Sequence, residues 1–288
     1  MTRVRKAVLP VAGFGTRVLP ATKTIPKEML PVFDRPAIQY VVDEAIAAGI
    51  EHFVFVTGRN KGAIEDYFDT AYELEASLEA KGKTDILAEV TGTKPIPGSM
   101  SFVRQQAPLG LGHAIWCARD IIGNDPFAVL LPDVLVQAEP SCLAQMIEVF
   151  DETGGNVIAV ERVPADEVNK YGIIDPESRE GNRMRMRGMV EKPAIGAAPS
   201  NLSITGRYIL QAKVFEYLAD QAAGAGGEIQ LTDAMARLMR SQDFHAVEYA
   251  GQSYDCGSKL GYLRATVGFA LSHPDLGEDA RKLIDAMK

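Results

Sequence analysis

The sequence predicts an α/β fold, a Rossmann-like doubly wound mixed sheet with a smaller antiparallel subregion. Three observations point to it. Short apolar runs alternate with amphipathic segments through the first half of the chain, as in βαβ units. A glycine-rich stretch follows the first apolar run, where open α/β sheets place their ligands. In the second half, short strand-like runs are separated by turn residues, which favours antiparallel pairing.

The first half of the chain predicts strand, loop, helix and strand in that order. Residues 7–12 are an apolar run that predicts a buried first strand. Residues 37–48 place apolar side chains on one helical face, and Gly49 is a natural helix end. Further elements follow from the same criteria: strands at 53–56, 102–104, 127–131 and 157–160, helices from Asn60 to near Phe68 and at 142–152, and an inserted helical stretch at 70–90.

The second half predicts three short strands and then helices. The strands lie around residues 172–174, 187–190 and 204–209, and the helices at 213–219, 231–240, from 259 onward and after Pro274. No low-complexity linker or internal repeat divides the chain. We therefore expect one domain over residues 1–288, with a half at about 1–160 and a half at about 161–270.

Composition narrows the function classes. The chain has 288 residues, 47% of them hydrophobic and 24% charged, which is enough apolar content for a substantial core. Its formal net charge of −8 argues against a nucleic-acid binder. The three cysteines lack metal-site or disulfide spacing, and the four histidines are isolated, so we read the histidines as surface or packing residues. Neither a signal-peptide core nor a membrane span is found, which predicts a cytoplasmic protein with no membrane partner.

The glycine-rich stretch from Gly13 to Arg17 is suited to a polyphosphate. Glycines let backbone N–H groups approach phosphate oxygens, and Arg17 adds a planar fork of donors. Lys27 follows between two prolines. A P-loop is excluded because no lysine follows the second glycine, and a dinucleotide fingerprint is excluded because Val18 occupies its third glycine position. A plain tight turn remains the alternative for so short a motif.

An aspartate follows the most apolar of the predicted strands. Asp133 follows residues 127–131 after a single proline, so its carboxylate is expected at the carboxyl edge of the sheet, where ligands of such sheets bind. A turn or cap is the commoner role for a single aspartate at a strand end.

Five separated motifs, taken together, resemble the sugar-1-phosphate nucleotidyltransferases. They are Gly13–Arg17 with Pro26–Pro31, Arg104–His113, Leu131–Val134, Tyr171–Ile173 with Glu191–Pro193 and Gly206–Tyr208, and Tyr254–Gly257. The strings Ala21–Lys23 and Ile38–Val42 resemble the bacterial UTP–glucose-1-phosphate uridylyltransferases in particular, and the resemblance covers about residues 4–272.

The resemblance implies substrates, a metal and roles for individual residues. UTP and glucose 1-phosphate are the implied partners, Mg²⁺ the implied cofactor, and a homo-oligomer (a dimer or tetramer) the implied assembly. The implied catalytic residues are Arg17, Lys27, Asp133 and Lys192. Nucleotide binding is assigned to Ala12, Gly13, Gly15, Thr16, Glu28, Gln105 and Gly110, the metal to Asp133 and Asp255, and the antiparallel sugar-phosphate subregion to Gly172, Glu191, Lys192 and Gly206.

The chemistry of these residue types agrees with the implied roles. A glutamine amide both donates and accepts, which matches the edge of uracil, and Lys192 can neutralise a sugar phosphate. The expected reaction is a direct in-line displacement at the α-phosphorus of UTP, with no covalent intermediate. Two alternatives remain open: a thymidylyltransferase that uses dTTP with the same sugar phosphate, and a non-catalytic nucleotide-sugar sensor on the same fold.

Overall fold

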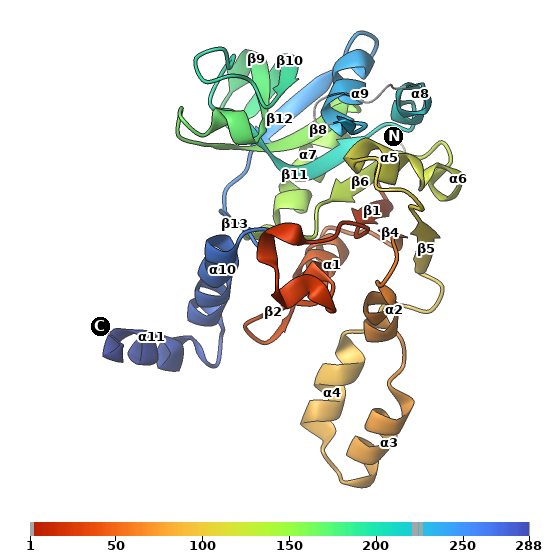
Figure 1. Cartoon of the computed structure of the whole chain (residues 1–288), viewed down its shortest axis with the longest axis vertical. Coiled ribbons are helices and arrows are strands. Elements are labelled where there is room, and N and C mark those ends of the chain that lie inside the picture. The colour runs from red at the N-terminus through yellow and green to blue at the C-terminus, as the bar shows by residue number, and fades with distance from the viewer. Residues whose placement is uncertain (1–2, 221–223, 225–226, 288) are drawn as a thin grey trace.

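A nine-stranded mixed sheet runs through the computed structural model, which describes residues 3–220, 224 and 227–287 (Figure 1). The strand order is β5–β4–β1–β6–β11–β8–β12–β10–β9. The strands are β1 Lys6–Pro10, β4 His52–Thr57, β5 Met100–Arg104, β6 Phe127–Leu130, β8 Asn156–Arg162, β9 Gly172–Glu180, β10 Arg183–Glu191, β11 Leu202–Leu210 and β12 Phe244–Glu248. The predicted α/β class with a mixed sheet is confirmed.

The four strands β5, β4, β1 and β6 are parallel, as the first half of the sequence predicts. Side chains alternate along them, so that Ala7 and Leu9 enter one core while Val8 enters the other. Helices α1 (Ala37–Ala47) and α7 (Cys142–Thr153) cover the first face, and α5 (Leu111–Trp116), α8 (Val214–Ala219) and α9 (Leu231–Leu238) cover the second. Because both faces are covered there, β1, β4 and β6 are mostly apolar, whereas the edge strand β5 is partly exposed.

The antiparallel strands of the second half continue the same sheet and do not form a separate one. Strand β11 inserts between the parallel strands β6 and β8 and pairs antiparallel with both. Strands β9 and β10 form an antiparallel hairpin at the far edge. The expected antiparallel pairing is therefore confirmed, but β11 lies at the centre of the sheet. Strand β12, which the sequence analysis missed, joins β8 to β10.

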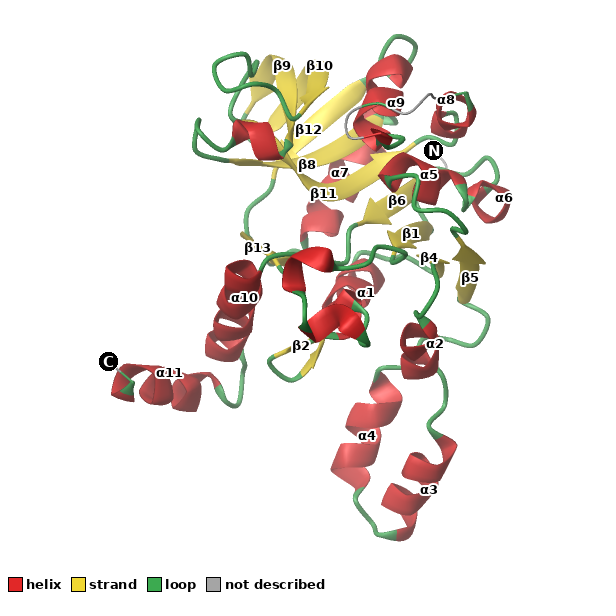
Figure 2. Cartoon of the chain, in the orientation of Figure 1, coloured by secondary structure: helices red, strands yellow, loops and turns green. Residues whose placement is uncertain are grey.

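Smaller elements decorate the sheet (Figure 2). The inserted stretch is a pair of helices, α3 (Tyr72–Ala80) and α4 (Thr84–Gly92), which projects away from the sheet in Figure 1 after α2 (Gly62–Phe68). Two-stranded ladders join β2 (Pro31–Val32) to β3 (Arg35–Pro36) and β7 (Val134–Gln137) to β13 (Gln252–Asp255). The remaining helices are α6 (Arg119–Ile122), α10 (Lys259–Ser272) and α11 (Gly277–Ala286). Among the residues that the structure describes, no helix has both the length and the apolar content needed to span a bilayer.

Candidate active site

The glycine-rich loop leaves the carboxyl end of β1 and folds back on itself. Gly15 has φ +67°, the left-handed region that favours glycine, and it precedes the short helical turn Thr16–Val18. A Cβ on Gly15 would lie 3.1 Å from the Cβ of Lys27, and the Thr22 hydroxyl donates to the Gly15 carbonyl at 2.7 Å. The backbone conformation therefore requires glycine at position 15, and the absence of a side chain there leaves room for Lys27.

The other loop residues present an exposed surface. Gly13 and Thr16 are exposed, and a Cβ on Gly13 would meet nothing closer than 3.9 Å. Ala12 is packed by its backbone against Gly58 after β4, where a Cβ would lie 3.1 Å from the Ala12 carbonyl oxygen. The loop thus offers its outer side, and with it exposed backbone, to a ligand.

Four charged side chains from distant parts of the chain meet beside this loop. The Lys27 ammonium donates to Asp133 Oδ2 at 2.6 Å. The Arg17 guanidinium lies between two carboxylates, 3.6 Å from Asp133 Oδ2 and 3.5 Å from Asp255 Oδ2. The structure therefore brings together four of the residues expected at the phosphates and the metal, whereas Lys192, the fifth, pairs with Glu191 instead.

Strand pairing explains why Asp255 arrives at this point. The ladder between β7 and β13 sets Asp255 opposite Val134, the residue after Asp133. The Cys256 N–H then donates to the Asp133 carbonyl at 2.7 Å. The Asp255 carboxylate also accepts from the Gly257 N–H at 2.9 Å, which holds it at the end of the strand.

The charges in this cluster are mutually stabilised. Burial alone would raise the pKa of Asp133, but the charge and hydrogen bond of Lys27, with Arg17, lower it below the usual range. Burial would lower the pKa of Lys27, but Asp133 and Glu28 raise it. Both groups are therefore charged at neutral pH. Since the folded-state pKa of Asp133 is depressed, the stability that this pair contributes is present above the ordinary aspartate pKa and lost as the pH falls below it.

The donor set suits a hard divalent cation. Asp133 and Asp255 lie on either side of the Arg17 guanidinium group, which is a cation that both carboxylates contact. No group of three or more His, Cys, Asp or Glu side chains suitable for a metal occurs within residues 3–220, 224 and 227–287. Mg²⁺ takes one or two protein carboxylates and completes its octahedron with water and phosphate oxygens. The two aspartates fit that pattern, and they do not form an all-protein cage.

The expected base pocket is built from two segments. The Gln105 side-chain nitrogen donates to the Gly110 carbonyl at 3.1 Å. Gly110 has φ +105°, and a Cβ there would lie 2.8 Å from the Ile229 carbonyl oxygen, so only glycine fits. Ile229 donates through its N–H to the Leu109 carbonyl at 2.7 Å. The pairing of these two segments was not predicted, because no local pattern in the sequence links residues so far apart.

Glu28, expected beside the nucleotide, has a buried side chain. It accepts a hydrogen bond from Lys61 Nζ at 2.8 Å. Burial raises the pKa of Glu28, while the charges of Lys61 and Lys27 oppose that shift. The other carboxylate oxygen, Glu28 Oε1, is buried with no hydrogen-bond partner among the described residues, and the assignment of Glu28 to the nucleotide stays a prediction.

The residues expected on the sugar side also cluster. Gly172 begins β9, and a Cβ on it would lie 3.1 Å from Glu191 Oε2 at the end of β10. The same carboxylate oxygen accepts from the Thr232 hydroxyl at 2.7 Å. Thr232 is the second residue of α9, which begins at Leu231, and its hydroxyl orients Glu191.

Two further sugar-side residues have left-handed backbone. Lys192 has φ +45°, which is uncommon for a residue with a side chain and is typical of constrained functional sites. Its ammonium is half exposed and lies 3.7 Å from Glu191 Oε1. Gly206 has φ +74° at an irregularity in β11, and a Cβ there would lie 2.9 Å from Leu131 Cδ1. Gly206 therefore allows the sugar side to approach the turn that carries Asp133.

A buried ion pair supports that same turn. Arg207 is fully buried, and its guanidinium donates to Glu44 Oε2 on α1 at 2.8 Å. It also donates to the carbonyls of Leu131 at 3.2 Å and Val134 at 2.8 Å, on either side of Asp133. Glu44 is 163 positions away in sequence, so local patterns gave no signal of this pairing.

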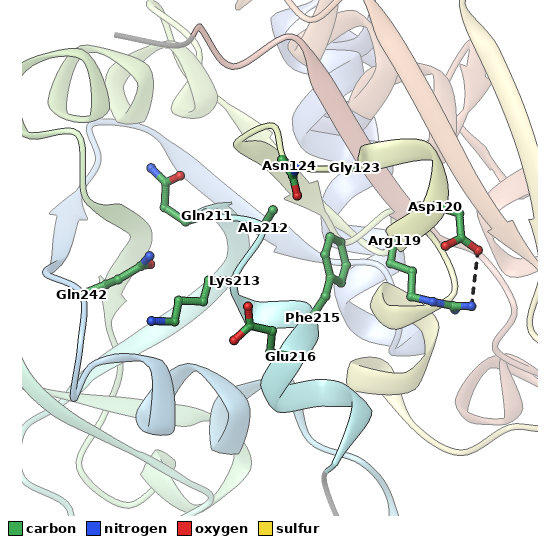
Figure 3. Close-up of a pocket in the computed structure, with 10 residues that line it drawn as sticks. All are labelled: Arg119, Asp120, Gly123, Asn124, Gln211, Ala212, Lys213, Phe215, Glu216 and Gln242. Atoms are coloured by element: carbon green, nitrogen blue, oxygen red, sulfur yellow. Dashed lines mark ion pairs between the residues drawn. The ribbon is translucent and has the colours of Figure 1, made fainter.

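A separate hollow lies at the opposite ends of the strands from Asp133 (Figure 3). Its volume is about 610 Å³, and it is lined from the start of β6 and the end of β11 by residues that include Asn124, Gln211 and Lys213. Several of its polar side chains already have protein partners, such as Gln211 with the Gly154 carbonyl at 3.0 Å. None of the residues assigned above to the nucleotide or the sugar lines it.

Comparison with known proteins places this arrangement in a family. The family model described as "Nucleotidyl transferase" matches residues 6–270. The UTP–glucose-1-phosphate uridylyltransferase of Bacillus subtilis (strain 168) is 50% identical over 96% of this chain and 94% of its own length. A UTP-bound UGPase from Acinetobacter baumannii superposes with a TM-score of 0.92 at 50% identity, covering 99% of this chain and 100% of the other.

A more distant solved structure shares only the fold. It is a putative glucose-1-phosphate thymidylyltransferase from Bacillus anthracis, with a TM-score of 0.71 at 23% identity over 91% of this chain and 94% of the other. The matches to the two uridylyltransferases cover nearly the full chain at 50% identity, about twice the identity to the thymidylyltransferase. The chain belongs to the nucleotidyl transferase family and, within it, to the UTP–glucose-1-phosphate uridylyltransferases.

Proposed function

We propose that this enzyme transfers the uridylyl group of UTP to glucose 1-phosphate and releases UDP-glucose and pyrophosphate. The observation that carries the proposal is the cluster of Arg17, Lys27, Asp133 and Asp255 beside the glycine-rich loop. Two cations and two carboxylates at one sheet edge suit a metal-bound triphosphate. The identity to uridylyltransferases over almost the whole chain supports uridine as the base and glucose 1-phosphate as the acceptor.

The nucleotide side uses the loop and its cations. Exposed backbone around Gly13 and the Arg17 and Lys27 side chains bind the triphosphate, and Gln105 with Gly110 binds the base. Asp133 and Asp255 would hold Mg²⁺, which when bound neutralises phosphate charge and polarises the α-phosphoryl group. In this structure, Arg17 and Lys27 form ion pairs with these carboxylates. When substrate binds, both cations are free to turn from carboxylate to phosphate without leaving the cluster.

The acceptor side uses Lys192 and Glu191. The Lys192 ammonium neutralises the phosphate of glucose 1-phosphate, and Glu191, held by Thr232, accepts from sugar hydroxyls. A phosphate oxygen of glucose 1-phosphate attacks the α-phosphorus of UTP, and the bond from that phosphorus to the bridging oxygen breaks as pyrophosphate leaves. The attacking oxygen is already anionic, so no general base is needed. Catalysis rests on positioning and charge neutralisation.

The two alternatives raised by the sequence are less well supported. The likeness to a thymidylyltransferase lies below 25% identity and concerns the fold, whereas the likeness to uridylyltransferases reaches 50%. A non-catalytic sensor has no support, because both carboxylates and all three cations are present.

Pyrophosphate release over a panel of substrates tests the proposal. We expect turnover with UTP, glucose 1-phosphate and Mg²⁺, a rate at least tenfold lower with dTTP, and loss of turnover after chelation by EDTA that added Mg²⁺ restores. Each nucleoside triphosphate is paired with each sugar 1-phosphate, and coupled detection of pyrophosphate gives the rates. Absence of turnover with UTP and glucose 1-phosphate refutes the assignment, and turnover unaffected by EDTA refutes the metal.

A homo-oligomer, dimer or tetramer, and a cytoplasmic location remain predictions. Helix α10 exposes Leu260 and Leu263, and α11 exposes Leu283, on the segment that projects from the sheet in Figure 1. Exposed leucines gathered on neighbouring helices favour a protein interface. Light scattering of the eluted protein is expected to give two or four times the 31.2 kDa chain mass, and an elution at one chain mass contradicts this expectation.

A further inference from the structure

The orientation of the Gln105 amide is fixed by its neighbours. Its side-chain nitrogen lies 3.1 Å from the Gly110 carbonyl oxygen and 3.1 Å from His113 Nδ1. A carbonyl oxygen can only accept a hydrogen bond, so the group of Gln105 that faces it must be the NH₂ end. The amide oxygen, Oε1, therefore points away from both partners.

The second partner, His113, must also accept. Because the Gln105 nitrogen donates to Nδ1, the imidazole is neutral and carries its proton on Nε2. Burial lowers the pKa of His113, which favours the neutral ring. The Cys117 thiol approaches the same Nδ1 at 4.0 Å, and the Trp116 ring stacks with the imidazole at a centroid distance of 5.9 Å. The imidazole is thus held in place from two sides.

The free amide oxygen matches one kind of base edge. Among residues 3–220, 224 and 227–287, no hydrogen bond to Gln105 Oε1 is present, and this oxygen is not among the buried atoms without a partner. An accessible acceptor suits the N3–H donor of uracil, whereas the N3 of cytosine is itself an acceptor. The arrangement therefore separates UTP from CTP by polarity at one atom.

We propose that His113 is a positioning residue that sets base selectivity by holding the Gln105 amide with its oxygen toward the nucleobase. The inference rests on the proposed function and adds a determinant of which pyrimidine is accepted. If the amide rotates by half a turn, Oε1 faces the Gly110 carbonyl and His113 Nδ1, two acceptors, and the NH₂ end faces the base. That rotated state would accept cytosine, and His113 supplies one of the two contacts that oppose it.

Two substitutions separate this role from packing. His113→Phe keeps an aromatic ring against Trp116 but removes the acceptor. His113→Asn loses the ring but keeps a carbonyl oxygen near the position of Nδ1. For His113→Phe we expect the ratio of kcat/KM for UTP to kcat/KM for CTP to fall about three- to tenfold, as for loss of one hydrogen bond. The change should arise mainly in the KM for UTP, since base contacts stabilise substrate and transition state alike. His113→Asn should restore most of the ratio.

His52→Phe serves as the matched control. His52 lies at the start of β4, the opposite end of that strand from the candidate site, and contacts Ser101 at 2.9 Å. Its substitution should leave the UTP-to-CTP ratio unchanged. Nitrogen-15 NMR of the histidine-labelled native enzyme provides a test that needs no variant, because it reports which ring nitrogen carries the proton.

The outcomes are distinct. An unchanged ratio in His113→Phe, an equal loss in His113→Asn, or a proton on Nδ1 of His113 at neutral pH each overturns the inference. Failure of the native enzyme to use UTP with glucose 1-phosphate overturns the proposed function instead. The NMR result still decides the inference if His113→Phe does not fold.

Discussion

Replacing Asp133 by asparagine is expected to lower kcat by about 10²–10³-fold, the range found when one preorganised charge-stabilising group is removed from an active site. Asparagine keeps the size of the side chain but removes the charge that Lys27 and Arg17 contact at 2.6 and 3.6 Å. It also removes one of the two carboxylates proposed to hold Mg²⁺. Initial rates at saturating UTP and glucose 1-phosphate, over a series of Mg²⁺ concentrations, measure the effect and should show a weaker apparent affinity for the metal.

Asp120→Asn is the matched control for this substitution. Asp120 is an exposed carboxylate on α6 that pairs with Arg119 at 3.3 Å, so its loss should leave kcat unchanged. A kcat for Asp133→Asn within threefold of the native value would contradict a role for this carboxylate in the reaction.

Replacing Arg207 by methionine is expected to lower the free energy of unfolding by about 3–5 kcal/mol, the cost of breaking a buried ion pair from one side. The substitution leaves Glu44 buried without its charged partner and deprives the Leu131 and Val134 carbonyls of a donor. The melting temperature should fall by roughly 10 °C. Differential scanning calorimetry of the variant measures this change.

Two further variants make the result specific. Arg185→Met removes a half-exposed guanidinium that contacts Glu177 and Asp243 on the surface, and exposed pairs contribute about 0–1 kcal/mol. The double change Glu44→Met with Arg207→Met removes both buried charges and should recover part of the stability. A melting temperature of Arg207→Met within 2 °C of the native value would show that the buried pair contributes little.

Much of the fold follows from local patterns. Strands β1, β4 and β6 are mostly apolar because both of their faces are covered, and their alternation with helices was readable from the sequence. Arg17, Lys27 and Asp133 were also accessible to sequence reasoning, since each follows a predicted strand, whereas Asp255 came only from the family resemblance. Their roles in binding and catalysis remain predictions that the experiments above test.

The remainder depended on contacts between distant segments. Nothing near Arg207 indicates that it pairs with Glu44, and nothing near Glu28 indicates that Lys61 covers it. The position of β11 between two parallel strands was likewise hidden, because strand order depends on long-range pairing and not on local propensity. The bond from the Thr232 hydroxyl to Glu191 was hidden for the same reason, because the two residues lie 41 positions apart.

The Leu131 N–H donates a hydrogen bond to the Gly206 carbonyl at 3.0 Å, which joins two segments of the candidate site through their backbones. Together with the bonds that Arg207 makes to Leu131 and Val134, it ties the turn that carries Asp133 to the central strand on the sugar side. The turn that carries Asp133 and the central strand β11 are thus joined by several hydrogen bonds. The long side chains of Arg17 and Lys192 are more than half exposed, so they are freer than the backbone to change conformation. If the proposed sites hold the two substrates, backbone geometry sets the spacing between the donor and acceptor phosphates, and the ligands bear little of the entropic cost of alignment.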